Sequence, residues 1–222
     1  MYKLFFLNQR YTMKLHLLAL LTLTFVSLKI DEQEWDRATI VKCKTAKDTD
    51  YLTAEEKGVI FYINLVRVNP NLFAKTYLKN YLDTAAIEKS IYLESLIKEL
   101  ESMSPIDVVE PKYDLYEEAK KHATDMGIQG KTGHISLKGE SYGKRVSNLS
   151  NRYLMALENC QYGYSDALSI VIDLLIDEDI PDLSHRKSLL NKEVKYVGAS
   201  IRKHKVYEYN CVIEMGYELK QP

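Results

Sequence analysis

The chain has 222 residues and a formal net charge of −1, with 46% hydrophobic and 27% charged residues. This length suits one domain preceded by a leader, and it is ample for a hydrophobic core. The composition is that of an ordinary globular protein. The balanced charge gives no sign of the strongly basic surface that nucleic-acid binding requires, so we expect no nucleic-acid partner.

The N-terminal segment has the pattern of a secretory signal, which we assign to residues 1–28. Arg10 and Lys14 precede a mostly apolar run over residues 15–28, and this order of a basic and an apolar region is typical of exported proteins. The run is shorter than the roughly 20 residues of a transmembrane helix. We therefore expect cleavage, no membrane span in the mature protein, and a secreted or cell-envelope location. Met13 is a possible true start, and an uncleaved membrane anchor is the alternative.

Helical patterns dominate the first two thirds of the remaining chain. Residues 29–52 are charged and lack a sustained apolar period, which predicts a linker before a domain over residues 53–218. Thr53-Ala54-Glu55-Glu56 is a capping box that begins a helix, and Asn69-Pro70 ends it. Apolar residues at helical spacing predict further helices over residues 71–81, 87–103, 113–129 and 165–177.

The C-terminal part changes to a period of two. Val197, Ala199 and Ile201 alternate with polar or small residues, and a second alternating run extends from Tyr207 to Met215. Two such runs around a short polar turn predict an antiparallel hairpin. Helices followed by late strands favour an α+β domain in which helices cover an antiparallel sheet.

Titratable groups beside turn residues mark the candidate site. His134 follows Gly133, His185 begins a polar stretch, and Glu158 precedes Asn159. A run of three acids, Asp177-Glu178-Asp179, precedes His185. Two imidazoles and two carboxylates in one cleft can bind a metal, relay protons or hold a polar ligand.

Two further residues have structural interpretations. His122 lies on the apolar stripe of its helix, which favours a packed, hydrogen-bonded histidine over a ligand. Asn191 is expected to lock the loop that carries His185. The chain has no G-x-S-x-G nucleophile motif, so covalent catalysis by serine has no support in the sequence.

Several of these stretches resemble the CAP superfamily, which includes cysteine-rich secretory proteins, antigen 5 and pathogenesis-related proteins. The resemblance runs from about Thr53 to Met215 and rests on four motifs: Gly133-His134-Ile135-Ser136, Glu158-Asn159, Leu183-Ser184-His185-Arg186-Lys187-Ser188-Leu189-Leu190-Asn191 and Tyr196-Val197-Gly198. It implies a three-layer α-β-α sandwich with a central antiparallel sheet and a C-terminal hairpin. It also implies a cleft in which Glu158 lies on a turn, together with His134, His185 and, at the end of the preceding helix, Asp177.

The chain departs from the family pattern beside Glu158. Leu157 stands where glycine is usual, and Cys160 stands where an aliphatic residue is usual. In the family's fold the segment after Glu158 runs into the central sheet, so the resemblance makes Cys160 and Cys211 possible neighbours. Export would allow them to form a disulfide, and the alternative is two buried free thiols.

Three functions remain open at this stage. The first is a binding module whose cleft takes a divalent metal, such as zinc on His134 and His185, or a small polar or lipidic ligand, as the resemblance implies. The second is a metal-assisted hydrolase of peptide or ester bonds, with Glu158 as the base. The third is an interaction protein that contacts an envelope component and has a vestigial cleft. The fold alone does not decide among them.

Overall fold

The computed structural model describes residues 35–85 and 87–218, which belong to one compact unit from Glu34 to Pro222. The predicted signal segment over residues 1–28, including Met13, lies outside the described residues. The helical elements are α1 (Arg37–Cys43), α2 (Ala54–Val68), α3 (Pro70–Phe73), the π-helical turn η1 (Ala74–Leu78), α4 (Lys79–Ala85), α5 (Ile91–Ser102), α6 (Tyr113–Gln129), α7 (Tyr142–Arg145), the 3-10 turn η2 (Leu149–Asn151), α8 (Ala167–Ile176) and α9 (Ser184–Leu189). The strands are β1 (Glu110–Pro111), β2 (Ala156–Tyr162), β3 (Tyr196–His204) and β4 (Glu208–Gly216).

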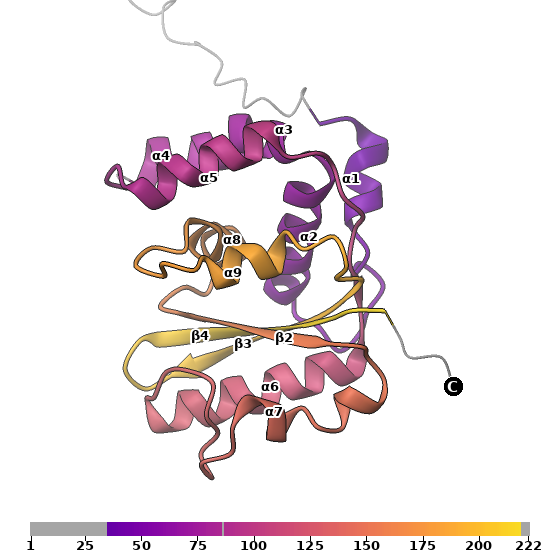
Figure 1. Ribbon diagram of the computed structural model, residues 1–222, viewed down its shortest axis with the longest axis vertical. Helices are drawn as coiled ribbons and strands as arrows, with labels where there is room; N and C mark the ends of the chain where they lie inside the picture. The colour runs from indigo at the N-terminus through magenta and orange to yellow at the C-terminus, as the bar shows by residue number, and fades with distance from the viewer. Residues whose placement is uncertain (1–34, 86, 219–222) are drawn as a thin grey trace, which may run out of the picture. The chain divides into compact units, whose positions relative to one another are not determined.

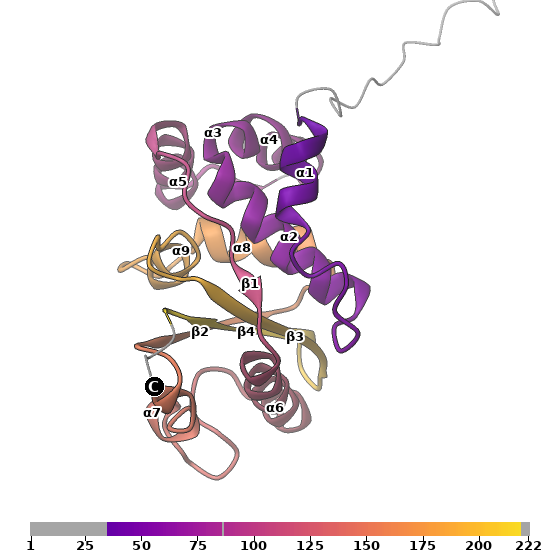
Figure 2. The ribbon, with the colours of Figure 1, turned by 90° about the vertical axis from the view of Figure 1, so that its right-hand side faces the viewer.

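A four-stranded sheet forms the middle layer, with the strand order β1-β3-β4-β2. The β3–β4 pair is the predicted antiparallel hairpin, and β2 joins β4 antiparallel, whereas the two-residue strand β1 runs parallel to β3. Helix α6 covers one face of the sheet, and α2, α8 and α9 cover the other (Figures 1 and 2). The structure thus confirms the predicted three-layer α-β-α sandwich. Among the described helices none is long and apolar enough to cross a membrane.

The layer between the sheet and helices α2 and α8 is an apolar core. On this face the sheet contributes alternate, fully buried residues of β3 and β4: Val197, Ala199, Cys211, Ile213 and Met215. They pack against apolar side chains of α2 and α8, such as Ile63 and Ile170. Full burial of a side chain of this size stabilises a fold by about 1.5–3 kcal/mol relative to exposure, so this layer supplies most of the hydrophobic stabilisation.

Helix α6 lies unusually close to the other face of the sheet. A Cβ atom at Gly198 of β3 would lie 2.1 Å from the backbone nitrogen of Tyr116, and one at Gly127 of α6 would lie 2.1 Å from the carbonyl oxygen of Lys203. No other residue type fits such approaches, so glycine is required on the strand at one end of the contact and on the helix at the other. This packing fixes the distance between α6 and the sheet, on the side to which the Glu158 side chain points.

The prediction of a linker over residues 29–52 is wrong for its described part. Trp35, Cys43, Ala46 and Leu52 are buried in the apolar core, and the Trp35 indole N–H donates to Thr76 Oγ1 at 3.0 Å. These buried residues are spaced irregularly among charged ones, so they produce no periodic signal. Residues 35–52 therefore belong to the domain.

The helix predicted over residues 165–177 begins later than expected. The side chain of Asp166, and not that of Ser165, accepts from Ser169 N–H, and α8 ends at Ile176. Asp177 follows as a left-handed residue with φ 58°. This sharp end of α8 directs the chain towards α9, which carries His185.

Two buried arginines hold the segments around α9. Arg67 donates to four backbone carbonyl oxygens, those of Asp107, Leu189, Asn191 and Val194, at 2.8–2.9 Å. Arg186 donates to the carbonyl oxygens of Tyr92, Leu175 and Ile176. Buried carbonyl groups need such partners, so Arg186 in the His-Arg-Lys motif is a structural anchor, next in the chain to a candidate site residue.

Candidate functional site

Three of the predicted site residues line one cleft. His134, Glu158 and His185 all border a cleft with a volume of about 640 Å³. The other lining residues are mostly polar: Tyr142, Leu157, Asp182, Ser184, Lys187, Ser188, Asn191 and Tyr217. Asp177 does not line the cleft but lies buried behind His185. The structure therefore brings the predicted residues together, with Asp177 in a supporting position.

His134 lies on a loop that is attached to both α6 and β2. The carbonyl oxygen of the preceding residue, Gly133, is 2.8 Å from His122 Nε2, and the Gly133 N–H donates to the Tyr162 hydroxyl at 2.8 Å. These bonds fix the point from which His134 projects. The His134 imidazole is half exposed, and its Nδ1 lies 2.8 Å from Glu158 Oε1. Because a carboxylate accepts, Nδ1 carries the proton.

Glu158 is a strand residue, and the expectation that it lies on a turn is wrong. It lies within β2, directly opposite Glu214 of β4, and its side chain is buried. Arg145 Nη2 lies 2.6 Å from both of its oxygens. Burial alone would raise the pKa of Glu158, but hydrogen bonds from His134 and Glu214 and the charge of Arg145 outweigh this effect, so its pKa lies below the usual value.

Glu214 is the buried partner of Glu158 on the neighbouring strand. It is fully buried, and the lack of water, together with the charge of Glu158, raises the pKa of Glu214 well above its usual value. Two carboxylates opposite each other on neighbouring strands repel, and a proton on Glu214 converts this repulsion into a hydrogen bond to Glu158. The Tyr142 hydroxyl, which lines the cleft, donates to Glu214 Oε2 at 3.0 Å.

Arg145 connects the cleft to α6. Its Nη1 donates to Glu118 Oε1 at 2.9 Å while Nη2 holds Glu158, so one buried guanidinium lies between two carboxylates. Its Nη2 also lies 3.3 Å from the carbonyl oxygen of His134. Burial would lower the pKa of Arg145, but the neighbouring Glu158 raises it. Arg145 is therefore a permanent positive charge that neutralises Glu158, and its contact with the His134 carbonyl oxygen holds the loop of His134 in place.

Asp177 bonds to Nδ1 of His185, as Glu158 bonds to Nδ1 of His134. Its Oδ1 lies 2.7 Å from His185 Nδ1, and its Oδ2 accepts from the backbone N–H groups of His185 and Arg186 at 2.9 and 3.1 Å. Those N–H groups belong to the first turn of α9, where backbone donors lack partners within the helix. Asp177 therefore caps α9 and orients its histidine at once.

The two cleft histidines share one arrangement. His134 and His185 each bond through Nδ1 to a carboxylate whose own side chain is about 1% exposed. Such a bond sets the tautomer, so in the neutral imidazole Nε2 carries the lone pair. Asn191 fastens the adjoining loop, since its amide N–H donates to the Tyr217 hydroxyl at 2.6 Å and its Oδ1 accepts from Glu193 N–H at 2.9 Å.

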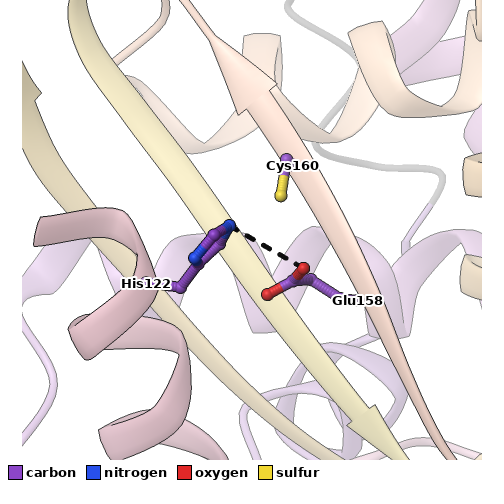
Figure 3. Close-up of side chains that lie close together, drawn as sticks. All are labelled: His122, Glu158 and Cys160. Atoms are coloured by element: carbon purple, nitrogen blue, oxygen red, sulfur yellow. Dashed lines mark ion pairs between the residues drawn. The ribbon is translucent and has the colours of Figure 1, made fainter. Parts of the chain in front are cut away.

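A second group combines Glu158 with His122 of α6 and Cys160 of β2, and the three side chains lie close together (Figure 3). One ligand atom from each lies within 4.8 Å of the others, a spacing at which a single ion can touch all three. Their chemistry is less suitable. His122 Nε2 faces a carbonyl oxygen and so carries a proton, and burial raises the pKa of the Cys160 thiol well above its usual value. His122 is thus the packed, hydrogen-bonded residue that its sequence position predicted.

Cys160 and Cys211 form no disulfide: all three cysteines of the chain are buried free thiols, which was the alternative that the sequence left open. Cys160 is paired with Val212, whereas Cys211 is paired with Gln161. Neighbouring positions on a strand point to opposite faces. Cys160 therefore faces α6, and Cys211 lies in the apolar core on the other side of the sheet.

The comparisons with known proteins agree with this fold. Residues 64–215 match the model of the cysteine-rich secretory protein family, CAP. The chain belongs to the CAP family. No curated protein matches it with significance.

Several solved structures are similar to this CAP domain. An outer surface protein from Borrelia burgdorferi is 21% identical, with a TM-score of 0.44 over 59% of this chain and 90% of that chain. An extracellular protein containing a SCP domain from Bacillus anthracis is 16% identical, with a TM-score of 0.45 over 77% of this chain and 45% of that chain. Venom allergen-like protein 4 of Schistosoma mansoni is 11% identical, with a TM-score of 0.44 over 77% of this chain and 92% of that chain.

Proposed function

We propose that this CAP domain is exported and binds a divalent metal ion, such as zinc, in the cleft through His134 and His185. One observation carries the proposal: both imidazoles bond to a buried carboxylate through Nδ1, so that in the neutral imidazole the lone pair of Nε2 can bind an ion. Metal-binding histidines usually have such a carboxylate or carbonyl partner on the other ring nitrogen. Neutral imidazole is also a ligand that zinc prefers.

The cleft carries polar groups beside the histidines that can hold a ligand. Around the histidines its lining offers a lysine, an amide and hydroxyl groups, from Lys187, Asn191, Ser184 and Tyr217. A bound divalent ion would add a positive charge that can hold a carboxylate or carbonyl oxygen of a ligand. We therefore infer that the cleft takes a small polar molecule or a polar group of an envelope component.

The geometry of Glu158 argues against the hydrolase alternative. A general base needs a free lone pair and access to water. Both oxygens of Glu158 accept from Arg145, Oε1 also accepts from His134, and the pKa of the group is lowered. Glu158 is thus suited to orienting His134 and poorly suited to taking a proton from water.

Metal binding tests the central part of the proposal. We expect the purified protein to take up about one zinc ion per chain, measured by elemental analysis after dialysis and by calorimetric titration. His134→Gln and His185→Gln should each abolish this uptake, whereas Ser184→Ala, a change in the same lining, should leave it intact. No uptake by the wild type, or uptake retained in both histidine variants, would show that the cleft is not a zinc site. Zinc-dependent turnover on peptide or ester panels would favour the hydrolase instead.

The export part rests on the basic and then apolar pattern of residues 1–28. Mass spectrometry of the native protein tests it. We expect an N-terminus downstream of the apolar run, in the secreted or envelope fraction. A cytoplasmic protein that begins at Met1 or Met13 would contradict it.

A further inference from the structure

The turn of the β3–β4 hairpin and the end of α6 expose large apolar side chains together. Ile128 is 69% exposed, Val206 64% and Tyr207 46%. Val206 and Tyr207 belong to the turn between β3 and β4, which lies on the left in Figure 1, and Ile128 belongs to the last turn of α6. None of them lines the cleft of His134 and His185, so this surface is separate from the proposed metal site.

Direct contacts join the hairpin turn to the end of α6. Lys205 N–H donates to the carbonyl oxygen of Gly127 at 3.0 Å. A Cβ atom at Gly130, the residue that follows α6, would lie only 2.8 Å from Val206 Cγ2. Ile128, Lys203 and Lys205 also border one shallow depression. We refer to Ile128, Lys131, Lys203, Lys205, Val206 and Tyr207 as the hairpin patch.

His204 fixes the shape of the hairpin patch. Its Nδ1 accepts from the backbone N–H groups of Val206 and Tyr207 at 3.2 and 3.1 Å, and its Nε2 donates to the carbonyl oxygen of Lys131 at 2.9 Å. The His204 ring also packs against Tyr207, with ring centroids 5.2 Å apart. The imidazole is buried, so the exposed apolar side chains project from a turn that is held from within.

The hairpin patch is basic, although the chain as a whole carries a net charge of −1. Lys131, Lys203 and Lys205 are all exposed, and Glu208 is the acid that borders the same depression. The patch thus presents apolar and cationic groups side by side. A surface that matches it must carry negative charge and accept projecting apolar side chains.

We propose that the hairpin patch docks on an anionic lipid bilayer. Val206, Tyr207 and Ile128 would enter the interface between headgroups and acyl chains, where tyrosine is favoured. The three lysines would lie at the anionic headgroups, each contributing attraction that salt screens. A shallow depression offers little enclosure for the side chain of a peptide, whereas a bilayer accepts projecting residues without a preformed pocket. This favours a lipid surface over an acidic protein.

Vesicle binding tests this proposal. The unit from Glu34 to Pro222 has its own complete core and excludes the apolar leader, so it is the protein to use. We expect it to sediment with vesicles of equal parts phosphatidylglycerol and phosphatidylcholine at least tenfold more strongly than with phosphatidylcholine alone. Half-molar salt should largely abolish this binding. The double variants Val206→Ser/Tyr207→Ser and Lys203→Glu/Lys205→Glu should each weaken it at least tenfold.

Matched variants elsewhere on the surface provide the control. Val41→Ser/Ile91→Ser removes exposed apolar side chains, and Lys47→Glu/Lys192→Glu reverses exposed charges, so both should bind as the wild type does. Equal binding to both vesicle types, unchanged binding of the patch variants, or equal losses in the control variants would overturn the proposal. So would equally strong binding to polyglutamate, which would indicate recognition of acidic groups without a bilayer. Circular dichroism should show that every variant is folded.

Discussion

The two faces of the sheet are both buried, but they contain different chemistry. Towards α2 and α8, strand β4 contributes Cys211 and Ile213, which lie in an apolar core. Towards α6 it contributes Asn210, whose amide donates to the carbonyl oxygen of Ala123, and Glu214, which belongs to the network around Glu158. One layer therefore stabilises the domain, and the other keeps charged groups in place beneath the cleft.

This difference changes how an alternating strand should be interpreted. Polar residues at every second position usually indicate a solvent-facing side of a sheet. In a three-layer sandwich that side is covered as well, so a charged residue there is buried and needs a partner. A carboxylate in the middle of such a strand is then a candidate for the functional site.

The largest loss of stability is expected for Arg145→Met, which disrupts the charged layer between the sheet and α6. The substitution leaves Glu158 and Glu118 without their buried counterion, and loss of one partner of a buried pair typically costs about 3–5 kcal/mol. Urea unfolding at neutral pH measures this cost. Lys121→Met removes an exposed lysine 3.8 Å from the same Glu118 and should change stability by less than about 0.5 kcal/mol. An Arg145→Met variant as stable as Lys121→Met would show that the charged layer is not held by this arginine.

A truncation in the apolar layer should behave differently. Ile213→Ala removes a fully buried side chain and should cost about 2–5 kcal/mol, through lost transfer energy and a cavity. Because no titratable group is removed, this cost should be the same at pH 5 and pH 8. Unfolding curves at both pH values provide the measurement. A cost that depends strongly on pH would show that the stability of the apolar layer is coupled to the charged groups.

Glu214→Gln should reveal the buried proton. The pKa of Glu214 is raised in the folded state, so its contribution to stability is fully present below the unfolded pKa of about 4.3 and is lost as the pH rises towards the folded value. Glutamine needs no proton. The variant should therefore gain stability relative to the wild type as the pH rises from 5 to 8, by at most about 1.4 kcal/mol per pH unit. A difference that stays constant with pH would mean that Glu214 is not protonated.

The smallest change in stability is expected for Asp177→Asn. Asparagine tolerates the left-handed conformation and can still cap α9, so the cost should be about 1 kcal/mol. If the cleft binds zinc as proposed, loss of the carboxylate behind His185 should weaken the affinity about 10–100-fold. Calorimetric titration tests this, with the exposed cleft residue Asp182→Asn as the control. Equal zinc affinities in both variants would leave Asp177 with a capping role alone.

The sequence predicted those parts of the fold whose residues repeat regularly. The capping box at Thr53, the apolar stripe of α6 and the alternation in β3 and β4 are local patterns, and each gave the element that the structure contains. The strand β2 has no such pattern, because it is an edge strand with polar residues directed into both layers. Helix α1 has only one buried residue of its own, Cys43, and therefore no period to detect.

The candidate site could be predicted only where motifs mark it. His134, Glu158 and His185 were indicated by their place beside turn residues and by the family resemblance, and they line one cleft. Arg145 was missed because it lies in a short helix without a periodic signal, 13 residues from its partner. Glu214 lies within the alternating run that predicted β4, and only the packing of α6 over that side of the sheet shows that it is buried. Such pairings depend on tertiary structure.

The order of strands in the sheet also bears on when the protein can fold. The central strands β3 and β4 are the last described elements of the chain, whereas β1 and β2, which are made earlier, pair only at the edges. Nascent domains generally fold as units once their sequence has emerged. The two central strands are absent until residues 196–216 are made. Before then, neither the apolar core nor the contacts of Glu158 with β4 can form. A chain with this strand order therefore completes its fold only at the end of its synthesis, which leaves it unfolded for as long as the export proposed above would need.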